Sequence, residues 1–471
     1  TLALRVWRDE LSSPLGLALA HPLYILLARG WAALLARAGG ALPLDDFAYR
    51  INLFSAVCAA ATIGLVWQLV ARLTGRRFGA AVAALVLAIS HTFWTHAVLT
   101  EVYALYGLLL LVELLLLERY ARTGRRGWLA AALLINGLNL SNHLLALLHL
   151  PGYAILIAWH IARRRLRASH VPALALLWIC GAGLYFGMIA GRIGAGDAPT
   201  AVLREALTGS PYGEAIAGEC FSAPAQAART AAVFVMNFPT PVLLLAIPGC
   251  FVLAQAGGRR VVTVFLLSLL VVNTVFGFSY TVPDQYVFFV AAYVILAVLI
   301  GAGAGRWATT ASRRRLCLAL AILPALVYEV APPLLQHYEV GLRSVRDLPN
   351  RSKYTYFFRP RKNGQNGAER FARQALETAG PDGLLMAGST MKAPIVYARE
   401  VQGDQRDVVL TIGGDVEPLP PTVPVTPLTV RRFAQQGRAF ITDVTPGYLS
   451  GWLIDQYDFE PAGPIYRLKP K

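Results

Sequence analysis

The sequence predicts an α-helical polytopic membrane protein with about ten or eleven transmembrane helices, followed by a small C-terminal α/β domain. Three observations lead to this fold class: an apolar composition, arginine clusters that alternate with apolar runs, and a change to polar composition near residue 340. Of the 471 residues, 56% are hydrophobic and 15% are charged. A soluble domain usually carries about a quarter charged residues, so the composition favours a lipid environment.

Apolar runs of nearly transmembrane length recur along the first 336 residues. Each approaches the length needed to cross a hydrocarbon core of about 30 Å. The runs fall at 50–72, 78–97, 102–118, 127–143, 144–162, 171–191, 230–256, 261–280, 285–302 and 315–336. Residues 49–336 are therefore predicted to form a transmembrane helical domain.

The arginines between these runs predict the topology. Five clusters lie in alternate connections: Arg72/Arg76/Arg77, Arg119/Arg122/Arg125/Arg126, Arg163/Arg164/Arg165/Arg167, Arg259/Arg260 and Arg306/Arg313/Arg314/Arg315. The other connections, at 90–101, 136–143, 192–229 and 278–285, hold only Arg192, Arg204 and Arg229. Because Lys and Arg concentrate in cytoplasmic loops, the clustered connections are predicted inside and the others outside.

Residues 1–48 are predicted to form a first outer loop with interfacial helices. The segment 14–38 is apolar enough to span, but a crossing there would invert the parity of every later loop. His21-Pro22 also interrupts it, and proline kinks a helix. We therefore expect 14–38 to lie at the outer surface, with Asp9 and Glu10 outside. Since the chain begins with Thr1, we also expect a further membrane helix upstream.

The net charge of +16 is interpreted as a membrane feature. Much of it lies in the predicted cytoplasmic loops, where anionic lipid headgroups are the expected partner. We expect no nucleic-acid partner. The same parity predicts that residues 337–471 are extracytoplasmic.

Residues 337–471 alternate between helical and extended patterns, which predicts a small α/β domain with a partly parallel sheet. Helical patterns are expected at 369–379, 391–400 and 429–436, and extended ones at 383–387, 408–412 and 439–442. A proline-rich connector precedes residue 429, and 464–468 is a candidate edge strand. The sequence has no glycine-rich phosphate loop, so we infer no nucleotide site.

Polar side chains at the predicted outer face are the candidates for chemistry. The first set is Asp9 and Glu10, followed by His21 and Tyr24. Adjacent carboxylates at a membrane surface can bind a divalent cation or act as a general base. The alternative is a solvated helix start with acids at the positive end of the helix dipole.

A second set follows the run at 78–97. His91 and His96 lie near Glu101 and Tyr103 at the outer boundary. The two histidines are five residues apart, which is not the spacing of a helical zinc pair. The alternative is an interfacial belt in which Trp94 and Tyr103 anchor helix ends. Glu101 is the strongest functional candidate of this set.

The remaining candidates are an amide-rich stretch and a short loop. Asn136, Asn139 and Asn142 lie in one hydrophobic block, where hydrogen bonds between helices are the expected role. Asn142 and His143, nearest the outer face, are also candidates to reach a ligand. Asp284 precedes the run at 285–302, and helix capping is its alternative role.

Several short motifs along the chain resemble those of a known protein family. They are Arg50-Ile51-Asn52-Leu53-Phe54-Ser55-Ala56, Thr92-Phe93-Trp94, Glu101-Val102-Tyr103-Ala104-Leu105, Gly137-Leu138, Asn142-His143, Asp284, Ile395–Gly403 and Asp407-Val408. Together they resemble a family of multi-spanning bacterial proteins in the GT-C glycosyltransferase superfamily. That family is similar to the eukaryotic transmembrane protein O-mannosyltransferases.

The resemblance implies a GT-C-like enzyme that takes a sugar, with mannose as one candidate, from a lipid-phosphate donor at the outer face. It implies a protein or glycan acceptor. An acidic residue in the first outer loop acts as base or metal partner in such enzymes. The family's Asp-Ser-Gly-Glu and His-Pro-Pro-Gly-Tyr-Pro stretches are replaced by Arg8-Asp9-Glu10-Leu11 and His21-Pro22-Leu23-Tyr24. Either Asp9 or Glu10 takes the family's Glu position.

The predicted site combines these observations. Asp9, Glu10 and Glu101 are the predicted catalytic residues, and Asp9 and Glu10 are the candidate ligands of a divalent cation. The predicted substrate-binding residues are His21, Tyr24, His96, Tyr103, Asn142, His143 and Asp284. Two other classes remain as alternatives, a membrane transporter and an inactive glycan-binding scaffold. Turnover would argue against the scaffold, and a paired-repeat architecture would favour the transporter.

Overall fold

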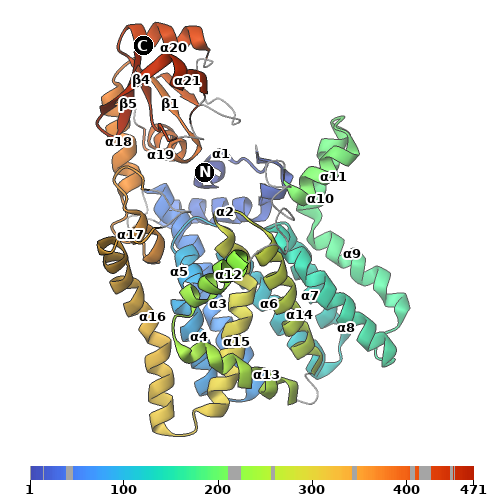
Figure 1. Cartoon of the computed structure of the whole chain (residues 1–471). Helices are drawn as coiled ribbons and strands as arrows, with labels where there is room; N and C mark the ends of the chain where they lie inside the picture. The colour runs from blue at the N-terminus through green and yellow to red at the C-terminus, as the bar shows by residue number, and fades with distance from the viewer. Residues whose placement is uncertain are drawn as a thin grey trace. The chain divides into compact units, whose positions relative to one another are not determined.

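The computed structural model describes residues 2–13, 15–38, 46–209, 224–255, 260–341, 347–403, 409–412, 426–445, 449 and 451–471. The chain divides into two compact units. The membrane unit comprises Leu2–Val340 with Phe358–Arg361, and the C-terminal unit comprises Gly341–Phe357 with Lys362–Lys471. The first unit is helical, and the second contains a sheet (Figure 1).

The membrane unit is built from α-helices and short 3-10 segments. Its elements are α1 (Leu2–Arg8), η1 (Leu17–Leu19), α2 (Pro22–Ala38), α3 (Phe47–Thr74), α4 (Arg77–Ile89), α5 (His91–Ala97), α6 (Tyr103–Thr123), α7 (Arg126–Leu140), η2 (Leu144–His149), α8 (Leu150–Ala162), η3 (Ala168–His170), α9 (Val171–Gly181), α10 (Gly183–Gly194), α11 (Pro199–Thr208), α12 (Pro224–Asn237), η5 (Pro241–Leu245), α13 (Ala246–Gln255), α14 (Arg260–Ser279), η7 (Gln285–Phe289), α15 (Val290–Trp307) and α16 (Ala311–His337).

Several of these helices are long and apolar enough to cross a membrane. Among the described residues, six pass by length and composition, and nine pass if each bent pair counts as one span. The bent pairs are α4 with α5, α9 with α10, and the α12 segment with η5 and α13, at angles of 69°, 76° and 97°. The predicted runs at 78–97, 171–191 and 230–256 are therefore broken rather than straight. The count of ten or eleven spans stays a prediction.

The first outer loop contains α1, η1 and α2. The sequence break at His21-Pro22 appears in the structure as a left-handed His21 (φ 55°) directly before α2. In Figure 1, α2 lies across one end of the bundle rather than along its helices. Residues 17–37 nonetheless satisfy the length and hydropathy of a span. The interfacial position of 14–38 therefore stays a prediction, which the break at His21 supports.

Helix α15 forms the centre of the membrane unit and is buried along most of its length. It packs against α4, α13 and η5. Glycines permit the close approach: a Cβ on Gly303 would lie 1.9 Å from the Leu245 carbonyl oxygen, and one on Gly249 would lie 1.9 Å from that of Leu299. Small residues at such crossings let helix backbones pack closely in membranes.

The C-terminal unit contains a five-stranded sheet in the order β2-β1-β3-β5-β4. Its elements are α17 (Lys353–Phe358, whose last residue belongs to the membrane unit), α18 (Gly367–Ala379), β1 (Leu384–Ala387), α19 (Ser389–Glu400), β2 (Val409–Ile412), α20 (Pro427–Gln435), β3 (Ala439–Ile441), α21 (Gly451–Gln456), β4 (Tyr457–Ala462) and β5 (Ile465–Pro470). β1 pairs in parallel with β2 and β3, whereas β5 pairs antiparallel with β3 and β4.

Two sequence expectations change in this unit. The candidate edge strand at 464–468 corresponds to β5, which lies between β3 and β4 and is therefore not an edge. The edge strands are β2 and β4, and the exposed side chains and Pro461 of β4 gave no clear alternating pattern. Val408 and most of the proline-rich connector lie outside the described residues.

Candidate functional site

The membrane unit contains a cavity of about 470 Å³. Its wall is formed by η1, the start of α6, η2, the end of α11, the end of α14 and the loop before η7. The polar lining residues are His21, Glu101, Tyr103, His143, Thr208, Tyr280 and Asp284. The other lining residues are Ala18, Leu19, Val102, Leu144, Leu145, Leu147, Leu148, Leu207, Gly209, Phe276, Val282, Pro283 and Phe288. The described lining thus combines a few polar groups with a largely apolar wall and includes no Lys or Arg.

Two carboxylates face this cavity from different connections. Glu101 precedes α6, and Asp284 precedes η7. Burial, with a smaller contribution from the neighbouring Asp284 carboxylate, raises the pKa of Glu101 to about 7. Burial also raises the pKa of Asp284. A carboxyl group with a pKa near 7 can accept a proton at physiological pH, as a general base must.

Asp284 does not perform the structural role that its position suggested. It occupies the N-cap of η7, yet its side chain makes no capping hydrogen bond. The carboxylate lines the cavity instead. This observation favours a ligand-facing role over helix capping.

Two histidines stack on the opposite part of the wall. The rings of His21 and His143 lie 5.2 Å apart with an interplanar angle of 17°. His21 Nδ1 is 2.8 Å from the Asn142 carbonyl oxygen, which fixes the first outer loop against the end of α7. His143 Nδ1 accepts a hydrogen bond from the Leu145 amide at the start of η2. Backbone geometry on both sides therefore holds the pair in place.

Aromatic rings connect these histidines to the acidic side of the cavity. Tyr103 lies 5.3 Å from the His143 ring and 4.8 Å from the His96 ring, measured between centroids. Tyr280 and Phe288 meet edge-to-face at 4.6 Å. Rings of this kind form a rigid boundary with polar hydroxyls at its edge.

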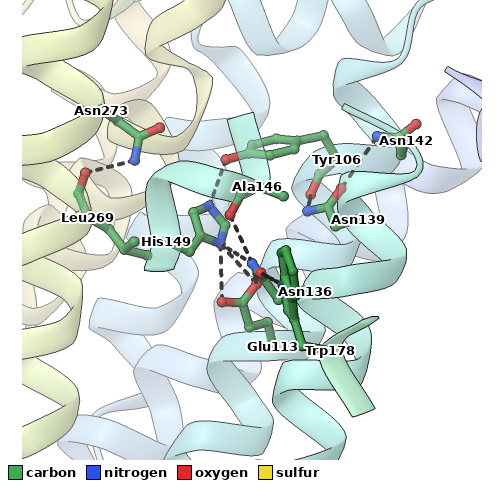
Figure 2. A network of polar contacts seen from close by, with 10 residues as sticks. All are labelled: Tyr106, Glu113, Asn136, Asn139, Asn142, Ala146, His149, Trp178, Leu269 and Asn273. Carbon is green, nitrogen blue, oxygen red and sulfur yellow. Dashed lines mark hydrogen bonds and ion pairs between the residues drawn. The ribbon is translucent and has the colours of Figure 1, made fainter. Parts of the chain in front are cut away.

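A buried polar network lies behind η2. Figure 2 shows His149 between Tyr106 and Glu113. The Tyr106 hydroxyl is 2.8 Å from His149 Nε2, and Glu113 oxygens are 3.0 and 3.1 Å from His149 Nδ1. Asn136 donates to Glu113 at 3.2 Å and accepts from Trp178 at 2.9 Å. Glu113, His149, Tyr106 and Asn136 are fully buried.

This network explains how polar groups are tolerated among apolar helices. Asn136 also donates to the Ala146 carbonyl oxygen within η2, at 3.2 Å. Asn139 donates to the Tyr106 carbonyl oxygen at 3.3 Å. The expected role of these asparagines as links between helices is therefore seen in the hydrogen bonds of Figure 2. The hydrogen bond from Asn136 to Ala146 fixes η2, whose leucines form one wall of the cavity.

The first-loop acids lie away from the lining. Asp9 adopts a left-handed backbone (φ 62°) and forms an ion pair with Arg29. Glu10 lies 3.4 Å from the Arg8 guanidinium. Each carboxylate of the predicted cation site is thus paired with an arginine. The described residues contain no group of three His, Cys, Asp or Glu side chains placed to hold a metal ion.

Three predicted substrate contacts also lie off the cavity wall. Tyr24 is fully buried, and its hydroxyl lies 3.1 Å from Ser55 Oγ on α3. His96 is buried behind Tyr103. Asn142 is buried, and its amide donates to the Val102 carbonyl oxygen at 3.3 Å. These residues support the wall from behind.

A buried arginine supports the His21 side of the cavity. The Arg5 guanidinium donates to the carbonyl oxygens of Leu19, at 2.9 Å, and of Ala20. Burial lowers the pKa of Arg5 to about 10. Leu19 and His21 both line the cavity, so a positive charge lies directly behind that part of the wall. Arg5 is not among the residues predicted from the sequence, because arginines in a short N-terminal helix match no functional motif.

Comparisons with known proteins agree with this architecture. Residues 17–166 match the family described as the Protein O-mannosyl-transferase TMEM260 N-terminal domain. The structure resembles ArnT from Cupriavidus metallidurans in the apo state, with a TM-score of 0.52, 14% identity, and coverage of 95% of this chain and 86% of that one. It also resembles ArnT from the same organism bound to undecaprenyl phosphate, with a TM-score of 0.53, 13% identity, and coverage of 99% and 96%. No curated protein matches.

The family match and the two structural matches test the family resemblance that the sequence predicted. At 13–14% identity the likeness to ArnT is one of fold, and it extends over nearly the whole chain. The family match covers His21, Glu101 and His143, which line the cavity. The predicted similarity to protein O-mannosyltransferases is thus confirmed: residues 17–166 match an O-mannosyl-transferase domain, and the fold resembles that of ArnT over nearly the whole chain.

Proposed function

We propose that this protein is an integral membrane glycosyltransferase that transfers a sugar from a lipid-phosphate donor to a protein or glycan acceptor. Mannose is the candidate sugar, because the family that matches residues 17–166 is named for O-mannosyl transfer. A lipid-phosphate donor is proposed because one matching ArnT structure contains undecaprenyl phosphate.

One observation carries this proposal. The cavity of the membrane unit joins two carboxylates, Glu101 and Asp284, to an apolar wall that includes Leu144 and Leu147. Such a wall suits a lipid tail, and the polar end suits a sugar with its reacting groups. Deep cavities with few, convergent polar groups and perturbed carboxyl pKa values are characteristic of active sites.

The chemistry assigns a role to Glu101. The acceptor hydroxyl oxygen forms a bond to the sugar's anomeric carbon, and the bond from that carbon to the phosphate oxygen breaks. Glu101 takes the acceptor proton, and the lipid phosphate leaves with the bonding electrons. The pKa of about 7 means that Glu101 is largely ionised just above neutral pH and is basic enough to accept this proton.

The leaving phosphate needs stabilisation of its negative charge. Burial lowers the pKa of His21 to about 4 and also lowers the pKa of His143, so both rings are neutral at physiological pH. Because His143 Nδ1 accepts a hydrogen bond, His143 Nε2 carries the proton and can donate a hydrogen bond to a phosphate oxygen, while the Arg5 guanidinium behind the wall supplies positive charge. Asp284 is proposed to hold sugar hydroxyls. Asp9 and Glu10 remain the alternative catalytic acids, which requires the first outer loop to move toward the cavity.

The proposed function also requires a position for the cavity in the membrane. We place the cavity at the outer face of a bacterial inner membrane, with membrane lipids around it and the C-terminal unit extracytoplasmic. The arginine clusters support this orientation, because they fall between helices at the opposite loops.

Sugar transfer by purified variants tests the function. Wild-type protein in lipid vesicles is supplied with polyprenyl-phosphate mannose and an acceptor extract, and transfer of radiolabel is measured. Glu101→Gln should lower transfer by about 10²–10⁴-fold, the usual effect of removing a general base. Asp9→Asn combined with Glu10→Gln should transfer at the parent rate if Glu101 is the base.

The control is Glu369→Gln, because Glu369 pairs with Arg373 on the exposed face of helix α18.

If the Asp9→Asn, Glu10→Gln double variant loses transfer while Glu101→Gln keeps it, the general base lies in the first loop. Binding of the donor without transfer by the wild type, across several polyprenyl-phosphate sugars, would favour the inactive scaffold.

A further inference from the structure

A second cavity lies within the C-terminal unit. It has a volume of about 270 Å³. Its lining comprises Asp347, Leu348, Pro349, Met391, Thr442, Asp443, Thr445, Pro461, Gly463, Pro464 and Tyr466. All of these residues belong to the C-terminal unit, so the cavity is independent of the membrane unit.

The topology of the sheet explains why a cavity forms there. From β1 the chain passes through α19 to β2 on one side, and then through α20 to β3 on the other side of β1. The pair β1/β3 is therefore the point where the strand order reverses. In open sheets of parallel strands, ligands bind in the crevice at the carboxyl ends of the strands flanking such a point.

The lining residues occupy that crevice. Thr442, Asp443 and Thr445 directly follow the carboxyl end of β3, and Met391 lies in the first turn of α19, after β1. The Gly388 amide donates to Thr442 Oγ1 at 3.3 Å, which ties the two strand ends together. The crevice is thus a fixed feature of the sheet rather than a gap between loops.

The polar side of the cavity consists of hydrogen-bond acceptors. Asp443 Oδ1 accepts from the Thr445 amide at 3.0 Å, which orients the carboxylate. Asp347 accepts from the Lys353 amide at 2.9 Å, and its other oxygen lies 3.3 Å from Lys353 Nζ. A carboxylate has about four acceptor positions, so it can accept hydrogen bonds from a ligand while it keeps its protein partners.

The other side is apolar and includes a ring. Tyr466 and the prolines Pro349, Pro461 and Pro464 line it. An aromatic ring facing carboxylates is suited to a ligand that has hydroxyl donors at its edge and C–H groups on its face, as a sugar ring has. Among the described lining residues there are two acids and no Lys or Arg, and Lys353 already pairs with one of these acids, Asp347; the second acid, Asp443, favours a ligand that donates hydrogen bonds over a phosphate.

We propose that this cavity binds one neutral sugar residue of a glycan, with Asp443 accepting hydrogen bonds from its hydroxyls and Tyr466 packing on its face. The site is distinct from the proposed transfer site and does not depend on catalysis. Such a site lets the C-terminal unit hold one part of a glycan chain while another part of the same chain reacts at a different site.

Direct binding to the full chain tests this site. Wild-type protein in lipid nanodiscs is titrated with methyl α-D-mannopyranoside, and the dissociation constant is measured by saturation-transfer difference NMR. Asp443→Asn should weaken binding at least tenfold, because an amide offers one acceptor oxygen in place of two. The variant should still fold, because the asparagine oxygen can accept the Thr445 amide. Tyr466→Ala should weaken binding comparably.

Two further proteins and one further ligand make the result decisive. Glu460→Gln is the matched control, since Glu460 pairs with Lys469 on β4 and does not line the cavity. Glu369→Gln on α18, which lies outside both cavities, should also bind the glycoside as the wild type does, and loss of binding in either control would overturn the proposal. Tighter binding of mannose 6-phosphate than of the neutral glycoside would overturn it, as would wild-type affinity in both Asp443→Asn and Tyr466→Ala.

Discussion

At the scale of single residues, five of the ten predicted site residues line one cavity. They are His21, Glu101, Tyr103, His143 and Asp284. The sequence could indicate them because polar side chains at the ends of apolar runs are costly unless they have a use. It could not indicate Phe276, Tyr280 or the η2 leucines, because an apolar side chain gives the same pattern whether it faces lipid, another helix or a cavity.

The proximity of the two cavity carboxylates predicts a pH effect. The negative charge of Asp284 contributes to the raised pKa of Glu101. If Glu101 is the base, transfer rises with pH as Glu101 loses its proton near pH 7. Asp284→Asn removes the neighbouring charge and lowers the pKa of Glu101, so the acidic limb of the rate profile should move to lower pH. If the acidic limb of the rate profile lies at the same pH in Asp284→Asn as in the wild type, the Asp284 charge does not influence the pKa of Glu101.

At the scale of elements, the glycines of the central helix predict a difference in stability. Gly303→Ala would place a Cβ 1.9 Å from the Leu245 carbonyl oxygen, so α15 and η5 must separate. We expect a loss of about 1–3 kcal/mol, as for other overpacked sites. The comparison is Gly64→Ala on α3, where a Cβ meets nothing within 4 Å.

Gly64→Ala should be neutral or should stabilise by about 0.4–1 kcal/mol, because it reduces the freedom of the unfolded chain. Thermal unfolding in detergent measures both variants. Equal unfolding temperatures for the two would argue against close packing of α15 against η5.

The network of Figure 2 predicts a coupled effect between elements. Glu113→Leu leaves His149 and Asn136 buried without their acceptor, so it should cost about 3–5 kcal/mol. The double variant with His149→Leu should lose less than the sum of the single losses, because both members of the buried pair are removed. Unfolding measurements on the four proteins give the coupling, and strict additivity would contradict the network.

At the scale of the whole molecule, the arginine pattern predicts which loops face the cytoplasm. In a chain whose native cysteines are replaced, Ala368→Cys, at an exposed position of α18, should react with a membrane-impermeant maleimide added from outside. Arg164→Cys, in the connection between α8 and η3, should be protected until the membrane is permeabilised. The opposite pattern would put the proposed transfer cavity on the cytoplasmic side.

Much of the architecture was predictable because long apolar runs and α/β alternation are local signals. The boundaries of α3 and α14 lie close to the predicted runs at 50–72 and 261–280, whereas the run at 285–302 begins with η7 and continues through α15 to residue 307. The breaks at Ser90 and Ala182 were not predicted, because a bend between two apolar helices needs no change in composition. The order of β4 and β5 depends on pairings between distant strands, which a single sequence does not reveal.

The 3-10 form of η2 has a consequence for the shape of the cavity. A 3-10 helix has three residues per turn, so side chains three apart lie in line along its axis. Leu144 and Leu147 form one such column, Leu145 and Leu148 form another, and all four line the cavity. In an α-helix the same four side chains would spread over one arc of about 160° instead of standing in two columns. The 3-10 form therefore predicts two parallel ridges on this part of the wall, and we expect a long, unbranched hydrocarbon chain to lie along the groove between them.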